Sequence, residues 1–288
     1  MILLLPACGK HRDGGGNTDD RPVLALSILP QSYFAARIAG DRVRIMVLVG
    51  PGQNPHDYEP SPKQMADLAA AKVWILSGTE FEISLQPKLE AVFPDLVIID
   101  GTQGVRFRPM EAHEDGDDKD HGDAIDRHTW LGHKPARIMA GHIQDALINM
   151  DPGSEVIYRQ NYRELTADMD REFGILRKKL SPLRGKVVFV YHPAFGYFLD
   201  EFGIIQEAVE SGGKEPTPRA LNSLIERAKK EKAAAIFVQA QFPVNTAKTV
   251  AAAAGAVLAS LDPLAPDWLA NIRSMGEILS KTAGETDK

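Results

Sequence analysis

Three histidines and one aspartate lie at the ends of apolar segments or just before a helical one, where ligand sites form in α/β proteins. They are His56, His128, His192 and Asp262. Three neutral imidazoles and a carboxylate make a tetrahedral donor set for zinc, and imidazole-rich sites favour zinc, copper or iron over magnesium and calcium. The sequence therefore predicts a transition-metal site that two halves of the chain share.

Each of these residues, taken singly, also fits a structural role. A histidine at the end of a strand often serves as a hydrogen-bonding residue, and Asp262 before Pro263 suits a turn-forming aspartate. The spacing matches no short zinc motif of the Cys₂His₂ or His-Glu-x-x-His kind. Because Cys8 is the single cysteine, neither an internal disulfide nor a cysteine-based zinc site can form.

Short, nearly continuous apolar runs predict the strands that position these residues. The runs are 23–29, 43–49, 73–76, 96–99, 187–191, 234–238 and 256–261. Such runs are typical of parallel strands buried on both faces, and segments of helical pattern such as 62–72, 219–232 and 245–254 alternate with them. This alternation predicts an α/β fold of two doubly wound parallel-sheet lobes.

One long amphipathic segment separates the two groups of strands. Apolar side chains recur there at steps of three and four: Tyr158, Tyr162, Leu165, Met169, Phe173, Leu176 and Leu180. Pro152 suits a first helical turn, and Pro182 ends the pattern. At ~1.5 Å per residue the helix is roughly 40–45 Å long, enough to join two lobes with a cleft between them. We expect an N-terminal lobe over 22–150, a linking helix over 151–181 and a C-terminal lobe over 182–288.

The N-terminal residues 1–21 resemble the remnant of a lipoprotein signal followed by a flexible tether. A short apolar stretch ends in Leu-Pro-Ala-Cys, where a bacterial lipoprotein signal places the cysteine that is lipidated, here Cys8. The glycine-rich, polar residues after it have no means of packing. The alternative is a stray cysteine in a polar tail. The prediction is a periplasmic or other extracytoplasmic protein anchored to a membrane through Cys8.

Composition narrows the class of protein. The chain has 288 residues, 44% of them hydrophobic and 25% charged, which argues against wholesale disorder and against a polytopic membrane protein. The formal net charge of −6 counts against nucleic acid as a partner, because phosphates require a basic surface.

Linked motifs resemble those of the metal-binding proteins that feed ABC importers, in particular the zinc branch of ZnuA-like and TroA-like solute-binding proteins. Residues 54–62 read Asn-Pro-His-Asp-Tyr-Glu-Pro-Ser-Pro, similar to the Pro-His-x-Tyr-Glu-Pro-[Ser/Thr]-Pro signature. Residues 126–131 are similar to Asp-Pro-His-x-Trp-Leu, and 192–198 match His-x-Ala-Phe-x-Tyr-Phe. Residues 236–242 and 261–264 are similar to the last two motifs of this family. The resemblance covers about residues 22–280 in order.

The resemblance implies that His56, His128, His192 and Asp262 bind Zn²⁺ and that the long helix joins the two lobes. Manganese-type relatives carry a carboxylate at the third position, so an imidazole there moves the preference toward zinc. Glu59 is a candidate accessory ligand or partner of a ligating histidine. The loop 111–126 holds eight acidic residues with His113 and His121 and resembles the metal-gathering loop of the zinc branch. A solvated charge run is the alternative.

The chain departs from the family pattern at several positions. Arg127 replaces the usual proline, Gln239 stands where the family often has glutamate, and His133 belongs to a Gly-His pair that replaces Ser-Pro. His133 and His142 are expected at the surface. His133 is near enough in sequence to His128 to compete for the site.

The function expected from these residues is capture of Zn²⁺ between the lobes and delivery to an ABC permease with its ATPase, by a monomer. We expect a binding protein, because four protein ligands leave no open position for catalytic water. The alternatives are a manganese or iron importer component of the same fold, a zinc-dependent hydrolase, and a metallochaperone or surface-exposed adhesin.

Overall fold

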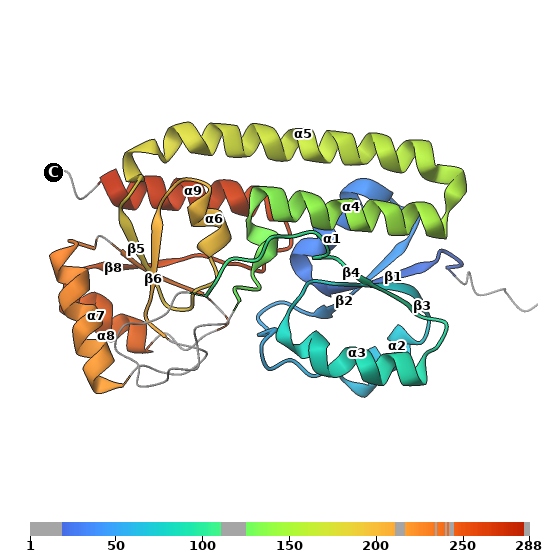
Figure 1. Ribbon diagram of the computed structural model, residues 1–288, viewed down its shortest axis with the longest axis horizontal. Coiled ribbons are helices and arrows are strands. Elements are labelled where there is room, and N and C mark those ends of the chain that lie inside the picture. Colours follow the sequence, from blue (N-terminus) through green and yellow to red (C-terminus); the bar gives the residue numbers. More distant parts are fainter. Residues whose placement is uncertain are drawn as a thin grey trace, which may run out of the picture.

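Two parallel β-sheets and one long helix organise the protein. This computed structural model describes residues 19–110, 125–210, 217–233, 235–239, 241 and 245–284. The sheets have the strand orders β2-β1-β3-β4 and β6-β5-β7-β8, and every strand pairing is parallel. The predicted fold class, two doubly wound α/β lobes joined by a long helix, is confirmed (Figure 1).

The first lobe is built from β1 (Val23–Ile28), α1 (Leu29–Ala39), β2 (Arg44–Val49), α2 (Pro62–Leu68), β3 (Ala71–Leu76), α3 (Glu80–Val92), β4 (Val97–Asp100), the 3₁₀ turn η1 (Thr129–Leu131) and α4 (His133–Met150). The second contains β5 (Val187–Val190), α6 (Gly196–Asp200), β6 (Ile205–Ala208), α7 (Pro218–Lys230), β7 (Ala235–Val238), α8 (Asn245–Ala254), β8 (Val257–Ser260) and α9 (Trp268–Gly284). In Figure 1, α2 and α3 lie on the side of the first sheet opposite to α1 and α4.

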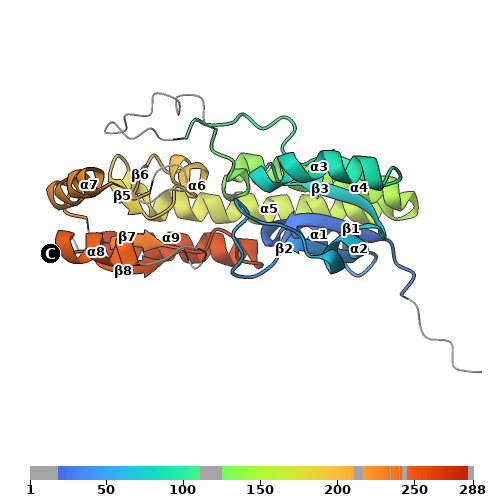
Figure 2. The same cartoon turned by 90° about the horizontal axis from the view of Figure 1, so that it is seen from below.

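Helix α5 (Glu155–Lys179) runs along both lobes (Figures 1 and 2). It begins after the 3₁₀ turn η2 (Pro152–Ser154), and the turn η3 (Ser181–Leu183) follows it. At ~1.5 Å per residue its 25 residues span roughly 37 Å. It packs against α1 and α4 of the first lobe and α9 of the second, so one rigid element supports both halves. The predicted lobe boundaries at residues 150 and 181 stay predictions.

The strands differ in burial according to their place in the sheet. The central strands β1 and β3 are almost completely buried, as the apolar runs predict. The expectation of burial on both faces is wrong for β4 and β8, where Val97 and Val257 are more than half exposed. Both are edge strands, which their neighbours cover on one side only.

The hydrophobic core is continuous between the lobes on the side where α5 lies. One cluster of buried residues contains Leu26 of β1, Phe173 of α5, Phe198 of α6 and Trp268 of α9. A second cluster lies under α7 and α8 and includes Phe189 of β5. Neighbouring residues of β5 thus face opposite clusters, as a strand buried on both faces requires. Among the described helices, none combines the length and the apolar character that a membrane span requires.

Phe173 is the side chain whose truncation is expected to destabilise the protein most within α5. It is fully buried and lies near His133 of α4, Phe198 of α6 and Trp268 of α9. We expect Phe173→Ala to lower the free energy of unfolding by about 3–5 kcal/mol, because the cavity opens where both lobes meet the helix. Chemical denaturation of the metal-free protein measures this. Ile175→Ala on the same helix is the control, since Ile175 is 52% exposed, and a change below about 1 kcal/mol is expected there.

Candidate metal centre

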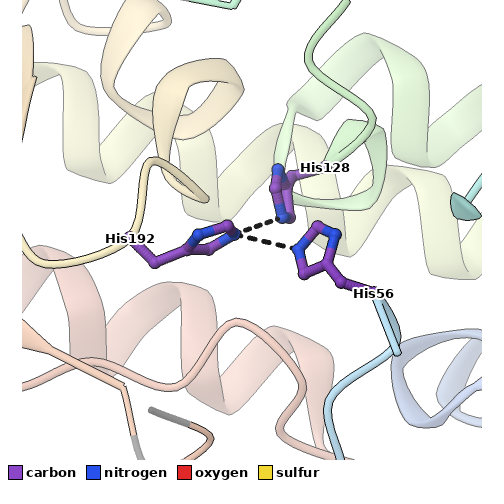
Figure 3. A group of neighbouring side chains, drawn as sticks. All are labelled: His56, His128 and His192. Carbon is purple, nitrogen blue, oxygen red and sulfur yellow. Dashed lines mark hydrogen bonds between the residues drawn. The ribbon is translucent and has the colours of Figure 1, made fainter. Parts of the chain in front are cut away.

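Three imidazoles converge between the lobes (Figure 3). The Nε2 atom of His192 lies 3.0 Å from Nε2 of His56 and 3.1 Å from Nε2 of His128. Among the described residues, these three histidines form the group whose ligand atoms all lie within 4.8 Å of one another. The structure therefore brings together three of the four side chains that the sequence nominates for a metal.

His56 lies in the connection between β2 and α2, and local hydrogen bonds hold that connection. The Oδ1 atom of Asn54 accepts a hydrogen bond from the backbone N–H of His56 at 3.1 Å. Helix α2 begins with a capping box: the Ser61 hydroxyl accepts a hydrogen bond from the backbone N–H of Gln64, and the Gln64 side chain accepts one from the backbone N–H of Ser61. Gln64 also donates from Nε2 to the carbonyl of Leu48 in β2 at 2.8 Å, which ties the connection back to the sheet.

Residues of the second lobe hold both the segment of His128 and the backbone of His192. The segment of His128 continues into Trp130, whose Nε1 donates to the carbonyl of Pro263 in the second lobe at 2.7 Å. His192 directly follows Tyr191 at the end of β5, and Gln239 at the end of β7 holds its backbone. The Gln239 amide donates to the His192 carbonyl at 2.7 Å and accepts from its N–H at 3.4 Å. A glutamate at position 239 could only accept, so the glutamine suits this backbone clamp.

A carboxylate contacts the other ring nitrogen of each histidine. The Nδ1 atoms of His56, His128 and His192 lie 2.9, 2.8 and 2.6 Å from carboxylate oxygens. The carboxylates belong, in the same order, to Glu80, Asp126 and Glu210. A neutral imidazole that donates its Nδ1–H to a carboxylate presents a lone pair at Nε2. Three such lone pairs converge here, which favours a cation between them.

The distances between the nitrogens suit a zinc-sized ion. Zn–N bonds of about 2.0–2.1 Å at tetrahedral angles separate two donors by about 3.3 Å. The 3.0 and 3.1 Å separations of the Nε2 atoms are a few tenths of an ångström shorter. Small outward rotations of the rings would therefore admit the ion without a change of backbone.

The turn that carries Glu80 is itself fixed by buried polar contacts. Glu82 is 2% exposed and accepts hydrogen bonds from the backbone of Ser77 at 2.7 Å and of Gly78 at 2.8 Å. Burial raises the pKa of Glu82 despite these hydrogen bonds. Arg127 donates to the Gly78 carbonyl at 2.9 Å, and its Nε lies 3.7 Å from Glu80. The arginine that departs from the family pattern thus supports the turn that orients Glu80.

The electrostatics of the centre favour neutral imidazole at its most buried position. Burial, followed by the charges of His128 and His56, lowers the pKa of His192 well below its ordinary value. At Glu80, burial raises the pKa, but the hydrogen bond and charge of His56 outweigh it and hold the pKa at about 2. His192 is therefore uncharged, and Glu80 ionised, across the physiological pH range.

The lowered pKa of His192 predicts a stability that declines as the pH falls below about 6.5, the ordinary histidine value. In that range the unfolded chain binds a proton at position 192 that the folded protein excludes, so acid favours unfolding by up to about 1.4 kcal/mol per pH unit. Denaturation of the metal-free protein at a series of pH values measures the slope. His192→Asn should flatten it and His142→Asn should not; equal slopes in wild type and His192→Asn would contradict the assignment.

The other nominated residues lie outside the three-histidine group. Asp262 is half-buried, and its Oδ1 accepts from Gln241 at 3.1 Å and from the backbone of Leu264 at 2.9 Å, as a turn-forming aspartate does. Glu59 is exposed. His113 and His121 lie outside the described residues. His133 contacts Asp170 at 2.7 Å and His142 contacts the carbonyl of Gln103 at 2.8 Å, so neither ring takes part in the group.

Comparison with known protein families identifies the family to which this chain belongs. A family described as "Zinc-uptake complex component A periplasmic" matches residues 24–282 of this chain. The chain belongs to that family. The resemblance read from the motifs is therefore confirmed, and this zinc-uptake family is one of solute-binding proteins and not of enzymes.

Relatives of this family member cover most of its length. The "High-affinity zinc uptake system protein ZnuA" of Bacillus subtilis is 26% identical over 91% of this chain and 85% of the relative. The "Manganese ABC transporter substrate-binding lipoprotein PsaA" of Streptococcus pneumoniae is 26% identical over 87% and 81%. The pneumococcal "Zinc-binding lipoprotein AdcA" is 28% identical over 91% of this chain, which spans only about half of that relative, 53%.

A solved structure supports the same relationship. The structure titled "Crystal structure of ZnuA" is 32% identical to this chain and superposes with a TM-score of 0.84, covering 91% of this chain and 99% of that one. A ZnuA deletion mutant solved with zinc bound matches with the same identity and TM-score. The backbone of this family member is therefore similar to that of ZnuA along most of the chain.

Proposed function

We propose that this chain is an extracytoplasmic binding protein that captures Zn²⁺ between its lobes and delivers it to the permease of an ABC importer. The convergence of three imidazole Nε2 atoms, each histidine backed by a carboxylate, carries the proposal. His56 and His128 belong to the first lobe and His192 to the second, so a bound ion joins the two lobes. Relatives named for zinc uptake and zinc binding support zinc as the cargo.

The fourth ligand in this proposal is Asp262. Its Oδ1 now accepts two hydrogen bonds, and the aspartate turns toward the ion when the site is filled. An acidic oxygen added to three imidazoles completes a tetrahedron for zinc. Further elements of the proposal are a membrane anchor on Cys8, function as a monomer, docking on the permease and its ATPase, and accessory metal contacts from Glu59, His113 and His121.

A competition titration tests the cargo. Metal-free protein is titrated with Zn²⁺ in the presence of excess Mn²⁺, and the bound metal is measured by mass spectrometry. One tightly bound zinc per chain, unaffected by manganese, is the expected result, and further weak zinc sites would implicate His113 and His121. Displacement of zinc by manganese would instead support the second candidate, a manganese-binding protein, which the similarity to PsaA brings forward.

The same titration on Asp262→Ala tests the fourth ligand. We propose a weaker zinc affinity in this variant, because the ion would keep three protein ligands and take water as the fourth. Wild-type affinity would assign Asp262 to the turn alone.

A further inference from the structure

Arg108 joins carboxylates from both lobes close to the metal centre. It lies in the segment after β4, and its Nη1 donates to Oδ2 of Asp126 at 2.9 Å. Its Nε donates to Oδ2 of Asp200, at the end of α6 in the second lobe, also at 2.9 Å. The Arg108 side chain is only 17% exposed and that of Asp126 is fully buried, so water screens this pair less than an ordinary surface ion pair.

A tyrosine and a glycine of α6 complete this contact. The hydroxyl of Tyr197 accepts a hydrogen bond from the backbone N–H of Arg108 at 3.0 Å and donates one to the carbonyl of Asp126 at 3.0 Å. A Cβ atom at Gly196 would overlap the Arg108 guanidinium, so the absence of a side chain lets α6 approach. The short helix α6 therefore meets the Arg108–Asp126 pair through three of its positions.

The contact between Arg108, Asp126 and α6 is connected to two of the three histidines, His128 and His192. Asp126 uses its other oxygen, Oδ1, to accept from the backbone N–H of His128 at 2.9 Å and to contact Nδ1 of that ring at 2.8 Å. Helix α6 begins four residues after His192, so it belongs to the segment that supplies the histidine of the second lobe. The lobes cannot separate here without breaking the bonds of Asp200 and Tyr197.

We propose that Arg108, Asp126, Tyr197 and Asp200 form an interlobe latch that keeps His128 aligned and holds the lobes together over the ion. Arg108 acts on His128 through Asp126, so it is a positioning residue. Release of the metal then requires the link between Arg108 and Asp200 to break. The inference rests on the proposed function for its cargo, although the latch itself is present without an ion.

Removal of the Asp200 charge tests the latch. Zinc-loaded wild type, Asp200→Asn and Glu201→Gln are mixed with excess chelator, and the rate of zinc release is followed by stopped flow. We expect Asp200→Asn to release zinc about two- to fivefold faster, because the amide oxygen can still accept from Arg108 but the charge of this partly exposed pair is lost. Glu201→Gln is the matched control, because Glu201 is the next residue and pairs with Arg177 of α5, away from Arg108.

Ionic strength separates a latch from a merely structural contact. The Asp200 side chain is 57% exposed, so salt screens its link to Arg108. Zinc release from wild type should therefore accelerate with added salt, and release from Asp200→Asn should be less sensitive. Equal release rates and equal salt dependence in the two proteins would overturn the proposal.

A measurement without metal keeps the latch testable if zinc is not the cargo. Lys88 of α3 and Lys230 of α7 are both exposed and are replaced with cysteine to carry spin labels, in the full chain with Cys8→Ser. Pulsed EPR then measures the distance between the lobes. We expect Asp200→Asn and Gly196→Ala to lengthen or broaden the distance distribution of the metal-free protein. Gly174→Ala on α5 is the control, since a Cβ there meets nothing within 4 Å. Unchanged distributions in both latch variants would overturn the latch, whereas absence of tight zinc in wild type would overturn only the proposed cargo.

Discussion

Replacement of His192 with alanine is expected to weaken zinc binding by more than about a hundredfold. Loss of a residue that only hydrogen-bonds to a metal ligand weakens binding by about 10–100-fold, and loss of the ligand itself should cost more. His192 is the ring whose Nε2 contacts both other imidazoles, at 3.0 and 3.1 Å, and it is the one member of the cluster from the second lobe. Without it, the second lobe would keep only the proposed ligand Asp262. Removal of the ring takes a hydrogen-bond partner from the buried Glu210 and so lowers stability. The fold should persist, because neither hydrophobic cluster includes His192.

Isothermal titration with Zn²⁺, using a competing chelator for the tighter proteins, measures this loss. His142→Ala is the matched control, since its ring contacts the carbonyl of Gln103 outside the cluster and should leave the affinity unchanged. Circular dichroism of both variants checks the fold. Wild-type affinity in a folded His192→Ala protein would remove His192 from the metal site.

Replacement of Glu210 with alanine is expected to weaken zinc binding by about 10–100-fold. Glu210 is 2% exposed, and its Oε1 lies 2.6 Å from Nδ1 of His192. The carboxylate fixes which ring nitrogen carries the proton and makes Nε2 a stronger donor. Without it, the ring can rotate and can present the wrong tautomer to the ion.

Glu207→Ala is the control for this second variant. Glu207 lies on β6, is 8% exposed and pairs with Arg227. Both substitutions remove a buried carboxylate, so both can lower the thermal midpoint. Only Glu210→Ala should change zinc affinity and the ¹⁵N chemical shifts of the His192 ring. Equal zinc affinities in the two variants would contradict an orienting role for Glu210.

Periodicity predicted the fold class because the central strands are apolar on both faces and the stripe of α5 repeats at helical steps. It missed β6, since Ile205–Ala208 includes Gln206 and Glu207. These side chains are buried because they have partners far along the chain: Gln206 accepts from the backbone of Phe195, and Glu207 pairs with Arg227. The hydrophobic pattern of a short segment cannot predict partners that lie so far away in the sequence.

The metal centre shows the same limit. Motifs nominated the three histidines that the structure brings together, but they did not single out the carboxylates that orient them. Glu80 and Glu210 are 24 and 18 positions away from their histidines, and only the fold brings them near. Asp126 was within reach of sequence reasoning, since an aspartate two residues before His128 can accept from its backbone N–H. Asp262 as a ligand stays a prediction.

The three rings differ in their access to water. The His56 side chain is 25% exposed and its partner Glu80 is 40% exposed, whereas His128 and His192 are 3% and 6% exposed. An ion is therefore expected to exchange in a fixed order, with the bond to His56 formed first and broken first. Once the link between Arg108 and Asp200 has broken, an incoming donor is expected to replace His56 before the remaining bonds to the ion break. The rate at which the ion departs then depends on the size and concentration of the molecule that receives it, and a receiving protein must offer its own donors on the His56 side.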